Sequence, residues 1–448
     1  MTTADLKQWA RRTLLGEDEK AAAPVSEPDG TNSGGSSSAQ KVMFATGIEC
    51  SYPVVQNGTH RVDALATTNH YNRWREDFFL TREMGIGHLR YGLPYHRVNP
   101  APGVYDWSFA DEAMREMRRL NIEPILDLCH FGMPDWLGNS FQNPEFPQAF
   151  ARYARAVAER YPQVTLYTPV NEIFVCAKFS ALFGWWNEQQ ASERAYVTAT
   201  KHLVQASLLA QREILTVQPR ALFIHSESSE RTHTACGCPP AHDRVDWENQ
   251  VRFLALDLLY AHEVRREIYT WLLDNGLTPQ EYAWFMENGT RRRCVLGNDY
   301  YVSNERILQH DGSVSHVGEV FGWYLVTREY YERYRMPVMH TETNLTDPHG
   351  PASVAWLWKQ WQSLLLMRDE GIPVLGFTWY SLIDQVDWDT ALREPNGTVN
   401  AVGLYDLDRK IRPVGDAYRH LIKEFGWMPI VPNCDFLGRE PANSPASR

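Results

Sequence analysis

The sequence predicts a protein of the α/β class built on a closed (β/α)8 barrel, the TIM barrel. Short apolar runs that suit buried parallel strands alternate along the chain with longer segments of helical periodicity. Polar residues gather where these runs end, which is the edge at which such a barrel carries its functional loops. The chain has 448 residues, and this fold needs about 250. One large domain of this kind therefore fits the chain.

The expected elements follow one another from Val42 onward. The predicted strands are 42–47, 86–91, 122–130, 166–170, 221–225, 295–301, 337–341 and 373–379. The predicted helices between them are 71–84, 108–120, 146–160, 192–215 and 352–368. Ser108 and Asp111 resemble a capping box and predict where the second of these helices begins.

Composition predicts the domain organisation. Residues 1–40 are expected to be a disordered tail, because 21–40 is built mainly from Ala, Pro, Ser, Gly and Glu. Residues 41–428 form the barrel domain, and 429–448 are a C-terminal extension. The segment 227–293 is too long for a simple loop. It contains helical sequence at 249–273 and a helix opened by Thr278-Pro279-Gln280-Glu281, so we expect an insertion that shapes a cleft.

Charge and targeting signals exclude several classes of protein. The net charge is -11, and Lys and Arg form no cluster of the kind that binds nucleic acid. No apolar stretch approaches the ~18 residues of a membrane span, and 1–20 is too charged for a signal peptide. Seven cysteines without regular spacing suit a reducing compartment. We therefore expect a cytoplasmic protein without nucleic-acid or membrane partners.

One segment has the residue types of a zinc site. His233, Cys236, Cys238 and His242 lie close together in the sequence. The spacing of the two cysteines is not that of a zinc knuckle, which usually separates its cysteines by two residues. We interpret the segment as a loop beside the cleft, and we expect no bound metal.

Two glutamates are candidates for paired acid and base chemistry. Glu172 follows the predicted fourth strand, and Glu342 follows the seventh. Carboxyl groups brought together from different strands are what cleavage of a glycosidic bond needs. One protonates the leaving oxygen, while the other attacks the sugar or activates water. The 16 Trp and 21 Tyr residues also suit the stacking of sugar rings, although large barrel cores use aromatic residues too.

The order of several motifs resembles glycoside hydrolase family 1, the β-glucosidase family. The motifs are Thr168-Pro169-Val170-Asn171-Glu172, His340-Thr341-Glu342-Thr343-Asn344, Asp384-Gln385-Val386-Asp387-Trp388, Gly403-Leu404-Tyr405-Asp406 and Arg412-Pro413. They are similar to that family's acid/base motif, its nucleophile motif, the motif after strand eight and the tail that follows. The resemblance extends over 44–424 and implies the same (β/α)8 fold.

The resemblance also implies roles for individual residues. Glu172 would be the acid/base and Glu342 the nucleophile, with Arg90 and Tyr301 supporting the nucleophile. The residues that it implies for substrate binding are His130, Asn171, Tyr380, Asp387, Trp388 and Glu49. Carboxyl groups about 5 to 5.5 Å apart are typical of the retaining mechanism, which requires no metal or organic cofactor.

Several positions depart from the family pattern in ways that affect sugar recognition. Tyr380 stands where the family has a Trp under the sugar, and Asp387 replaces a longer Glu. The segment Ser51-Tyr52-Pro53 lacks the family's hydroxyl-binding Gln, so that Glu49 or Gln56 would take its place. Ile173 and Phe131 replace a usual Pro and a usual Trp. These changes leave the catalytic pair in place.

We therefore expect an exo-acting retaining β-glycosidase that removes a non-reducing terminal sugar from a small glycoside or an oligosaccharide. Two alternatives stay open. The first is a transglycosidase of the same fold, which transfers the sugar to an alcohol in place of water. The second is a non-catalytic barrel that binds carbohydrate, and the presence of both glutamates speaks against it. The sequence specifies neither the sugar and its linkage nor the oligomeric state.

Overall fold

The structure is a computed structural model that describes residues 40–235, 237 and 239–430. The chain divides into two compact units, Met1–Ala39 and Gln40–Arg448. The predicted tail lies outside the described residues except for Gln40, as do Cys236, Cys238 and most of the predicted C-terminal extension.

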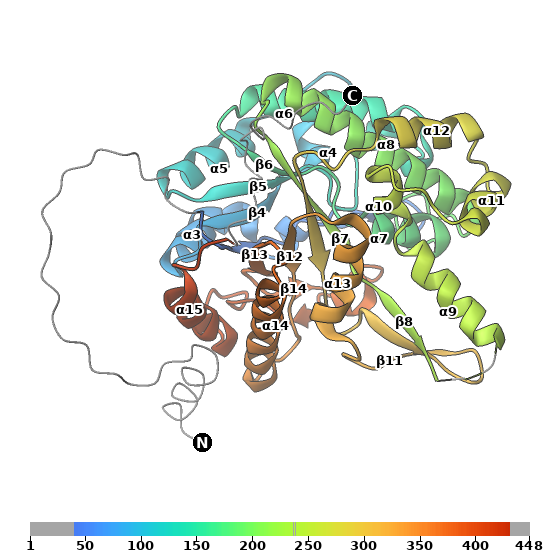
Figure 1. Cartoon of the computed structure of the whole chain (residues 1–448). Helices are drawn as coiled ribbons and strands as arrows, with labels where there is room; N and C mark the ends of the chain where they lie inside the picture. The colour runs from blue at the N-terminus through green and yellow to red at the C-terminus, as the bar shows by residue number, and fades with distance from the viewer. Residues whose placement is uncertain (1–39, 236, 238, 431–448) are drawn as a thin grey trace, which may run out of the picture. The chain divides into compact units, whose positions relative to one another are not determined.

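Eight parallel strands close into a barrel within the described part of the chain, which confirms the predicted fold (Figure 1). Neighbours in the barrel are also neighbours along the chain, and β1 pairs with both β4 and β13 to close it. The strands are β1 (Met43–Gly47), β4 (His88–Gly92), β5 (Glu123–Asp127), β6 (Leu166–Thr168), β7 (Leu222–Ser228), β9 (Cys294–Asp299), β12 (Val338–Glu342) and β13 (Val374–Trp379). All eight correspond to expected strands, with ends that differ by a few residues.

Helices connect successive strands and surround the barrel (Figure 1). The longer ones are α3 (His70–Glu83), α5 (Ser108–Arg119), α6 (Phe146–Arg160), α8 (Glu193–Val217), α13 (Gly322–Tyr334), α14 (Pro351–Asp369) and α15 (Pro413–Phe425). The shorter ones are α2 (Ala64–Thr67), α4 (Tyr95–Val98), α7 (Ile173–Ala177), η1 (Asp135–Leu137), η2 (Ser140–Gln142), η3 (Lys178–Leu182) and η4 (Trp388–Thr390).

The segment between β7 and β9 contains the predicted additional helices. They are α9 (Pro239–Val251), α10 (Leu254–Leu259), α11 (Arg266–Asp274) and α12 (Pro279–Asn288). The helical sequence expected at 249–273 is divided among α9, α10 and α11. The start of α12 is confirmed: the Thr278 hydroxyl accepts from the Glu281 amide, and the Glu281 carboxylate accepts from the Thr278 amide.

The capping box expected at Ser108 is also wrong. Ser108 is the first residue of α5, and the N-cap is Trp107, which makes no side-chain capping bond. The Asp106 carboxylate instead accepts from the Ser108 amide at 2.9 Å. The acidic residue that precedes the helix therefore satisfies one of the free amides at its start.

Small sheets form around the carboxyl ends of the barrel strands. A three-stranded sheet contains β8 (Arg231–Thr234), β10 (Glu305–Leu308) and β11 (Val314–His316). Two further pairs are β2 (Val54–Val55) with β3 (His60–Arg61), and β14 (Gln385–Val386) with β15 (Val399–Asn400). Each belongs to a segment that follows a barrel strand, so these sheets build the rim above the barrel.

The hydrophobic core has two parts. A smaller cluster consists of side chains from seven barrel strands, namely Ala45, Ile125, Leu166, Leu222, Ile224, Val295, Met339 and Leu375. Because side chains alternate between the two faces of a strand, this cluster fills the barrel interior. A much larger cluster lies between the strands and the surrounding helices. The side chains of this smaller cluster therefore close the barrel interior below the rim.

A buried ion pair connects α3 to the segment that precedes α15. Asp77 in α3 accepts from Arg409 Nε at 2.8 Å and Nη2 at 3.0 Å, and lies 2.7 Å from His70 Nδ1. Burial opposes the Asp77 carboxylate, but the hydrogen bonds from His70 and Arg409 outweigh burial and hold its pKa below the usual range. The pair thus joins two segments that are far apart in the sequence.

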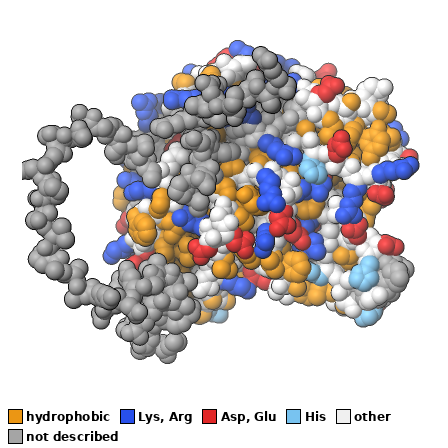
Figure 2. Space-filling view, viewed as in Figure 1, with side chains coloured by type: hydrophobic (Ala, Val, Ile, Leu, Met, Phe, Trp, Pro, Cys, Tyr) orange, Lys and Arg blue, Asp and Glu red, His pale blue; other side chains and the backbone are white. Residues whose placement is uncertain are grey.

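Charged side chains are dispersed over the visible surface. On the face in Figure 2, basic and acidic side chains are interspersed wherever the residues are coloured, and no continuous basic surface forms there. None of the described helices combines the length and the apolar composition that crossing a bilayer requires.

The buried ion pair predicts a large effect of Asp77→Asn on stability. The substitution leaves Arg409 buried without its charged partner, so the free energy of unfolding should fall by about 3 to 5 kcal/mol. Because the pKa of Asp77 is lowered in the folded state, the wild-type contribution is complete above about pH 4 and is lost as the pH falls further.

Chemical denaturation at pH 7 measures this effect. Glu159→Gln is the matched control, because it breaks an exposed pair with Arg155 and should change stability by at most about 0.5 kcal/mol. Equal effects of the two substitutions would contradict the role of the buried pair.

Candidate active site

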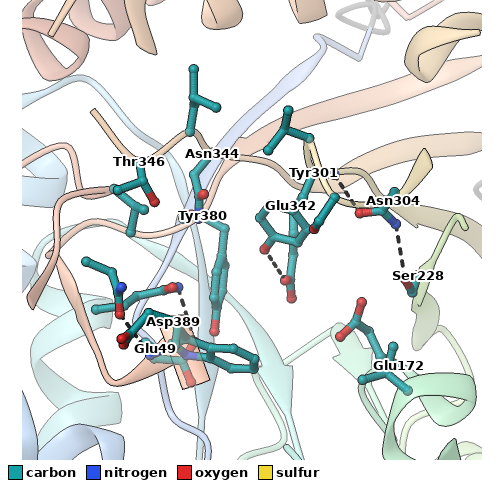
Figure 3. A pocket seen from close by; sticks show the side chains of 18 of the residues that line it. Glu49, Glu172, Ser228, Tyr301, Asn304, Glu342, Asn344, Thr346, Tyr380 and Asp389 are labelled. Carbon is teal, nitrogen blue, oxygen red and sulfur yellow. Dashed lines mark hydrogen bonds between the residues drawn. The ribbon is translucent and has the colours of Figure 1, made fainter. Parts of the chain in front are cut away.

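A cavity of about 420 Å³ opens at the carboxyl ends of the barrel strands. Both predicted catalytic glutamates line it, from different strands (Figure 3). Figure 3 shows Glu342 near the centre beside Tyr301 and Tyr380, and Glu172 to one side near Ser228. Glu49 lies on the opposite side. The two glutamates that the sequence predicted to act together therefore lie around one cavity large enough for a sugar.

Two donors hold the Glu342 carboxylate at the end of β12. Arg90 Nη1 donates to Oε1 in a short contact, and the Tyr301 hydroxyl donates to Oε2 at 2.6 Å. The Glu342 side chain is almost completely buried. A cation and a hydroxyl that both donate to it favour the charged form. Glu342 is thus oriented and charged, as a nucleophile must be.

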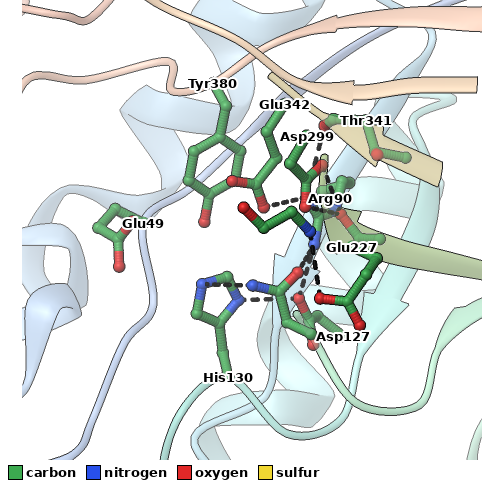
Figure 4. Close-up of polar contacts among 12 residues, drawn as sticks. Glu49, Arg90, Asp127, His130, Glu227, Asp299, Thr341, Glu342 and Tyr380 are labelled. Atoms are coloured by element: carbon green, nitrogen blue, oxygen red, sulfur yellow. Dashed lines mark hydrogen bonds and ion pairs between the residues drawn. The ribbon is translucent and has the colours of Figure 1, made fainter. Parts of the chain in front are cut away.

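Arg90 is the centre of this polar network (Figure 4). Besides Glu342, its guanidinium donates to Asp127 Oδ2 at 3.0 Å and to Asn171 Oδ1 at 2.7 Å. Burial disfavours the cation, but the charges of Glu342, Asp127 and Asp299 outweigh burial and raise the pKa of Arg90. Arg90 and Asn171 lie behind the lining residues, and they act on the cavity through Glu342 and His130.

His130 follows β5 and lies between Asp127 and Asn171. Its Nδ1 is 2.9 Å from Asp127 Oδ2, and its Nε2 is 3.2 Å from the amide nitrogen of Asn171. The Asn171 oxygen must face Arg90, which has only donors, so the amide nitrogen faces Nε2. This geometry fits the neutral ring with its proton on Nδ1.

Glu172 has the opposite electrostatic environment. It lies between β6 and α7 with a left-handed backbone (φ 40°), and its amide donates to the Ser226 carbonyl at 2.9 Å. Burial raises the pKa of its carboxyl well above the usual range, and the carboxyl groups of Asp299 and Glu342 raise it further. Glu172 is therefore protonated at neutral pH. A pair of carboxyl groups in such different environments can serve as a general acid and a nucleophile.

Tyr380 forms a wall of the cavity after β13. Its ring is nearly parallel to that of His130, with centroids 6.2 Å apart, and its centroid lies 5.4 Å from the Arg90 guanidinium carbon. The ring packs directly against Gly47, where an added Cβ would lie 2.1 Å from a Tyr380 ring carbon. Only glycine allows this close approach, so β1 and Tyr380 are matched in shape.

Glu49 lies on the side of the cavity away from Glu172 (Figure 3). Its Oε1 accepts from the amide of Ser51 at 2.9 Å and from the Ser51 hydroxyl, and its Oε2 accepts from the Gln385 amide at 3.3 Å. Burial raises the pKa of Glu49. Gln56, the alternative candidate at this end, is exposed in the turn after β2 and does not line the cavity.

The predicted residues after strand eight have different positions. Trp388 lines the cavity and packs against Phe131 and Trp186. Asp387 is not among the lining residues, and its carboxylate accepts from the Thr398 amide at 2.8 Å. Asp387 therefore holds the loop between β14 and β15. Asp389 and Gln385 line the cavity in that region, and neither position was predicted from the sequence.

Other lining residues were also missed, mainly beside Glu172. Those with polar side chains are Ser228, Glu230, Ser303, Asn304, Asn344, Thr346 and Asn400, and the apolar ones include Val175, Phe179 and Val302. A signal was present for two of them, because Ser228 and Glu230 follow a predicted strand as Glu172 does. The Glu230 carboxylate is compensated by Lys178 at 2.8 Å and by Arg306 at 2.7 Å.

One group of described residues has the ligand types of a metal site. The ligand atoms of Cys50, Asp127 and His130 lie within 4.8 Å of one another. Asp127 Oδ2, however, already accepts from Arg90 and contacts His130 Nδ1. A metal ion there would lie beside the Arg90 cation and would displace both contacts, so this set fits a hydrogen-bond network better than a metal site.

Comparisons with known proteins agree with this geometry. The sequence model described as "Glycosyl hydrolase family 1" matches residues 50–222. The aryl-phospho-beta-D-glucosidase BglA of Bacillus subtilis (strain 168) is 24% identical over 422 residues, which cover 81% of this chain and 85% of that protein. The beta-glucosidase of Agrobacterium sp. is 23% identical and covers 84% and 88% of the two chains. The chain is thus similar to glycoside hydrolase family 1.

The fold is shared with solved structures. The family 1 β-glucosidase from Thermotoga maritima, solved in complex with deoxynojirimycin, matches with a TM-score of 0.71 at 17% identity. The match covers 85% of this chain and 97% of that one. The relatives thus include proteins named as β-glucosidases and proteins named as phospho-β-glucosidases, and the cavity itself must distinguish between these substrates.

Adjacent tyrosines allow a matched test of the site. Tyr301→Phe removes the hydroxyl that donates to Glu342, so kcat/KM for an aryl β-glycoside should fall roughly 10- to 100-fold, as expected for the loss of a charge-assisted hydrogen bond. The fold should be unchanged.

Tyr300→Phe is the control, because the Tyr300 hydroxyl donates to Glu305 at 2.6 Å, and neither residue lines the cavity. It should lower thermal stability but leave kcat/KM within a few fold of wild type. Similar losses of activity in both variants would mean that the Tyr301 hydroxyl has no special role.

Proposed function

We propose that this protein is an exo-acting retaining β-glycosidase that hydrolyses a non-reducing terminal β-linked sugar with Glu342 as nucleophile and Glu172 as acid/base. The observation that carries the proposal is the pairing of a charged Glu342 with a protonated Glu172 around one cavity. Retaining glycosidases need this pair of protonation states at the start of the reaction.

In the first step, Glu342 attacks the anomeric carbon while Glu172 donates its proton to the leaving oxygen. The bond from the sugar to the leaving group breaks as the bond to Glu342 forms. Arg90 and Tyr301 keep the attacking carboxylate in place, and neither needs to move.

In the second step, Glu172 acts as the base. Once Glu342 is esterified, its negative charge no longer raises the pKa of Glu172, so Glu172 can hold a charge and accept a proton from water. Water then attacks the anomeric carbon and releases Glu342. Two inversions leave the sugar with its original anomeric configuration.

The charges of the lining residues favour an unphosphorylated sugar. Five lining residues are acidic: Glu49, Glu172, Glu230, Glu342 and Asp389. Among the lining residues, all of which belong to the described part of the chain, there is no Lys or Arg. A phosphorylated sugar carries a charge near -2 and is normally bound by cations. This supports a β-glycosidase over a phospho-β-glycosidase.

The cations that contact lining residues already form ion pairs with carboxylates. Arg90 binds Glu342 and Asp127, and Lys178 and Arg306 both bind Glu230. None is available for a phosphate group without separating a buried ion pair, which is costly.

The side of the cavity away from Glu172 supports exo action. Phe131, Trp186 and Trp388 pack against one another there, and Phe131 and Trp186 are completely buried. Glu49 and Gln385 add polar groups that suit the hydroxyls of a terminal sugar. The opening therefore lies on the other side, where the leaving group would extend past Glu172.

Glu342→Gln and Glu172→Gln should have distinguishable effects. Glu342→Gln removes the nucleophile and should lower kcat by roughly 10⁴-fold or more for every substrate. Glu172→Gln should cost about 10²- to 10⁴-fold with a poor leaving group, and far less in the glycosylation step with a good one such as dinitrophenol.

Initial rates with aryl β-glycosides of graded leaving-group pKa measure this difference, and each variant is the control for the other. The anomer formed first, followed by ¹H NMR, should be β. An α product would indicate inversion, and transfer of the sugar to an added alcohol in preference to water would indicate a transglycosidase.

Unphosphorylated substrates should be strongly preferred. In paired assays of an aryl β-glycoside and its 6-phosphate, kcat/KM should favour the unphosphorylated sugar by at least about 100-fold, because like charges brought together cost several kcal/mol.

Glu49→Gln keeps the shape of the side chain but removes its charge. The substitution should lower kcat/KM for the unphosphorylated sugar. It should also reduce the ratio of the kcat/KM values for the unphosphorylated and the phosphorylated sugar. Preference of the wild type for the 6-phosphate would overturn the proposed substrate class but leave the proposed mechanism intact.

A further inference from the structure

Asp299 is a third carboxyl group at the centre of the site, and the proposed mechanism does not use it. It is the last residue of β9, is completely buried, and pairs in register with Glu342 on β12. Figure 4 shows Asp299 beside Glu342 and Arg90. An ionisable group so close to a nucleophile affects the charge balance of the whole site.

Ser226 connects Asp299 to Glu172 as well. The Ser226 hydroxyl lies 2.8 and 2.7 Å from the two oxygens of Asp299. The Ser226 carbonyl accepts from the Glu172 amide at 2.9 Å. Asp299 is therefore bound to the same β7 residue that positions the proposed acid/base, while its own strand is adjacent to that of the proposed nucleophile.

Charge balance decides the state of Asp299. The charged and titratable groups that face it are Arg90 from β4, Glu172 before α7, Glu227 from β7, Tyr301 after β9 and Glu342 from β12. Arg90 is the cation among them, and it is already paired with two carboxylates. Burial, followed by repulsion from Glu342, raises the pKa of Asp299 to about 8. At neutral pH, Asp299 is therefore largely protonated.

We propose that Asp299, which is buried beside Glu342 and bound to Ser226, is a positioning residue that acts through Glu172: its carboxylate holds the proton on Glu172 and extends the working range of the acid/base to higher pH. This rests on the proposed role of Glu172. Two interacting carboxyl groups lose their protons in two steps, and the first loss makes the second more difficult. When Asp299 ionises first, Glu172 keeps its proton and remains an acid.

Asp299→Asn tests this proposal, because Asn has the same shape and can accept from Ser226 but has no charge. The basic limb of the profile of kcat/KM against pH should move to lower pH by roughly one unit or more, as expected for the loss of a buried neighbouring charge. The acidic limb should not move, because Asp299 is neutral in that range. A structural defect alone would lower the whole profile and move neither limb selectively.

Ser226→Ala is the matched control. It removes the same hydrogen bond from the other side but keeps the carboxyl group, so its basic limb should move to lower pH by less than that of Asp299→Asn. A 2-deoxy-2-fluoro aryl glycoside traps the glycosyl-enzyme and so counts the functional active sites. Rates divided by this count give a pH profile that is independent of any misfolded fraction of a variant.

A basic limb that is unchanged in Asp299→Asn, or that shifts equally in Ser226→Ala, would overturn the proposal. Failure of the proposed function has a different signature, because the wild type would then not hydrolyse aryl β-glycosides, or Glu172→Gln and Glu342→Gln would retain full activity. The two proposals can therefore fail separately.

Discussion

The active site depends on a single buried guanidinium. Arg90 is completely enclosed, and three groups that meet the cavity or lie directly behind it, Glu342, Asp127 and Asn171, accept from it. Without this cation, several carboxyl groups in a low-dielectric space would have to take up protons. Arg90 thus determines that Glu342 is charged, and the charge on Glu342 in turn helps to keep Glu172 protonated.

The barrel provides the geometry that this electrostatic arrangement needs. The members of the network come from the carboxyl ends of β4, β5, β6 and β12, and these strands are held in register around a filled core. Side chains on such a frame lose little freedom when a substrate binds, because they are already held in place. Variation is left to the segments that follow the strands, where the small sheets and short helices form the walls of the cavity.

The sequence predicted the barrel well, because periodicity and strand ends are local signals. It missed α13, whose N-terminus has no side-chain cap of its own. The Glu305 carboxylate, distant in the sequence, instead accepts from the amides of Val320, Phe321 and Gly322. A tertiary contact of this kind leaves no local pattern.

The cavity lining shows the same limit. Positions directly after strands, such as Glu172 and Glu342, could be predicted to meet there. Positions within the loop after strand eight could not be predicted to line the cavity. The backbone of Asp387 is left-handed and changes the direction of the chain, so that Asp389 lines the cavity and Asp387 does not. Asp299 was also overlooked as a functional group, because its neighbours become visible only when the strands are paired.

Glu305 also connects the rim sheet to the residue next to Tyr301, whose hydroxyl donates to Glu342. The same carboxylate contacts His233 of β8, accepts from the Tyr300 hydroxyl next to Tyr301, and caps α13. Burial opposes its ionisation, yet the hydrogen bonds from His233 and Tyr300 and those from the α13 amides lower the pKa of Glu305 to about 2. The Glu305 carboxylate therefore links the three-stranded rim sheet to Tyr300 and to the start of α13. Divergence that reshapes this rim must keep these contacts together or rebuild the hydroxyl donor that faces Glu342.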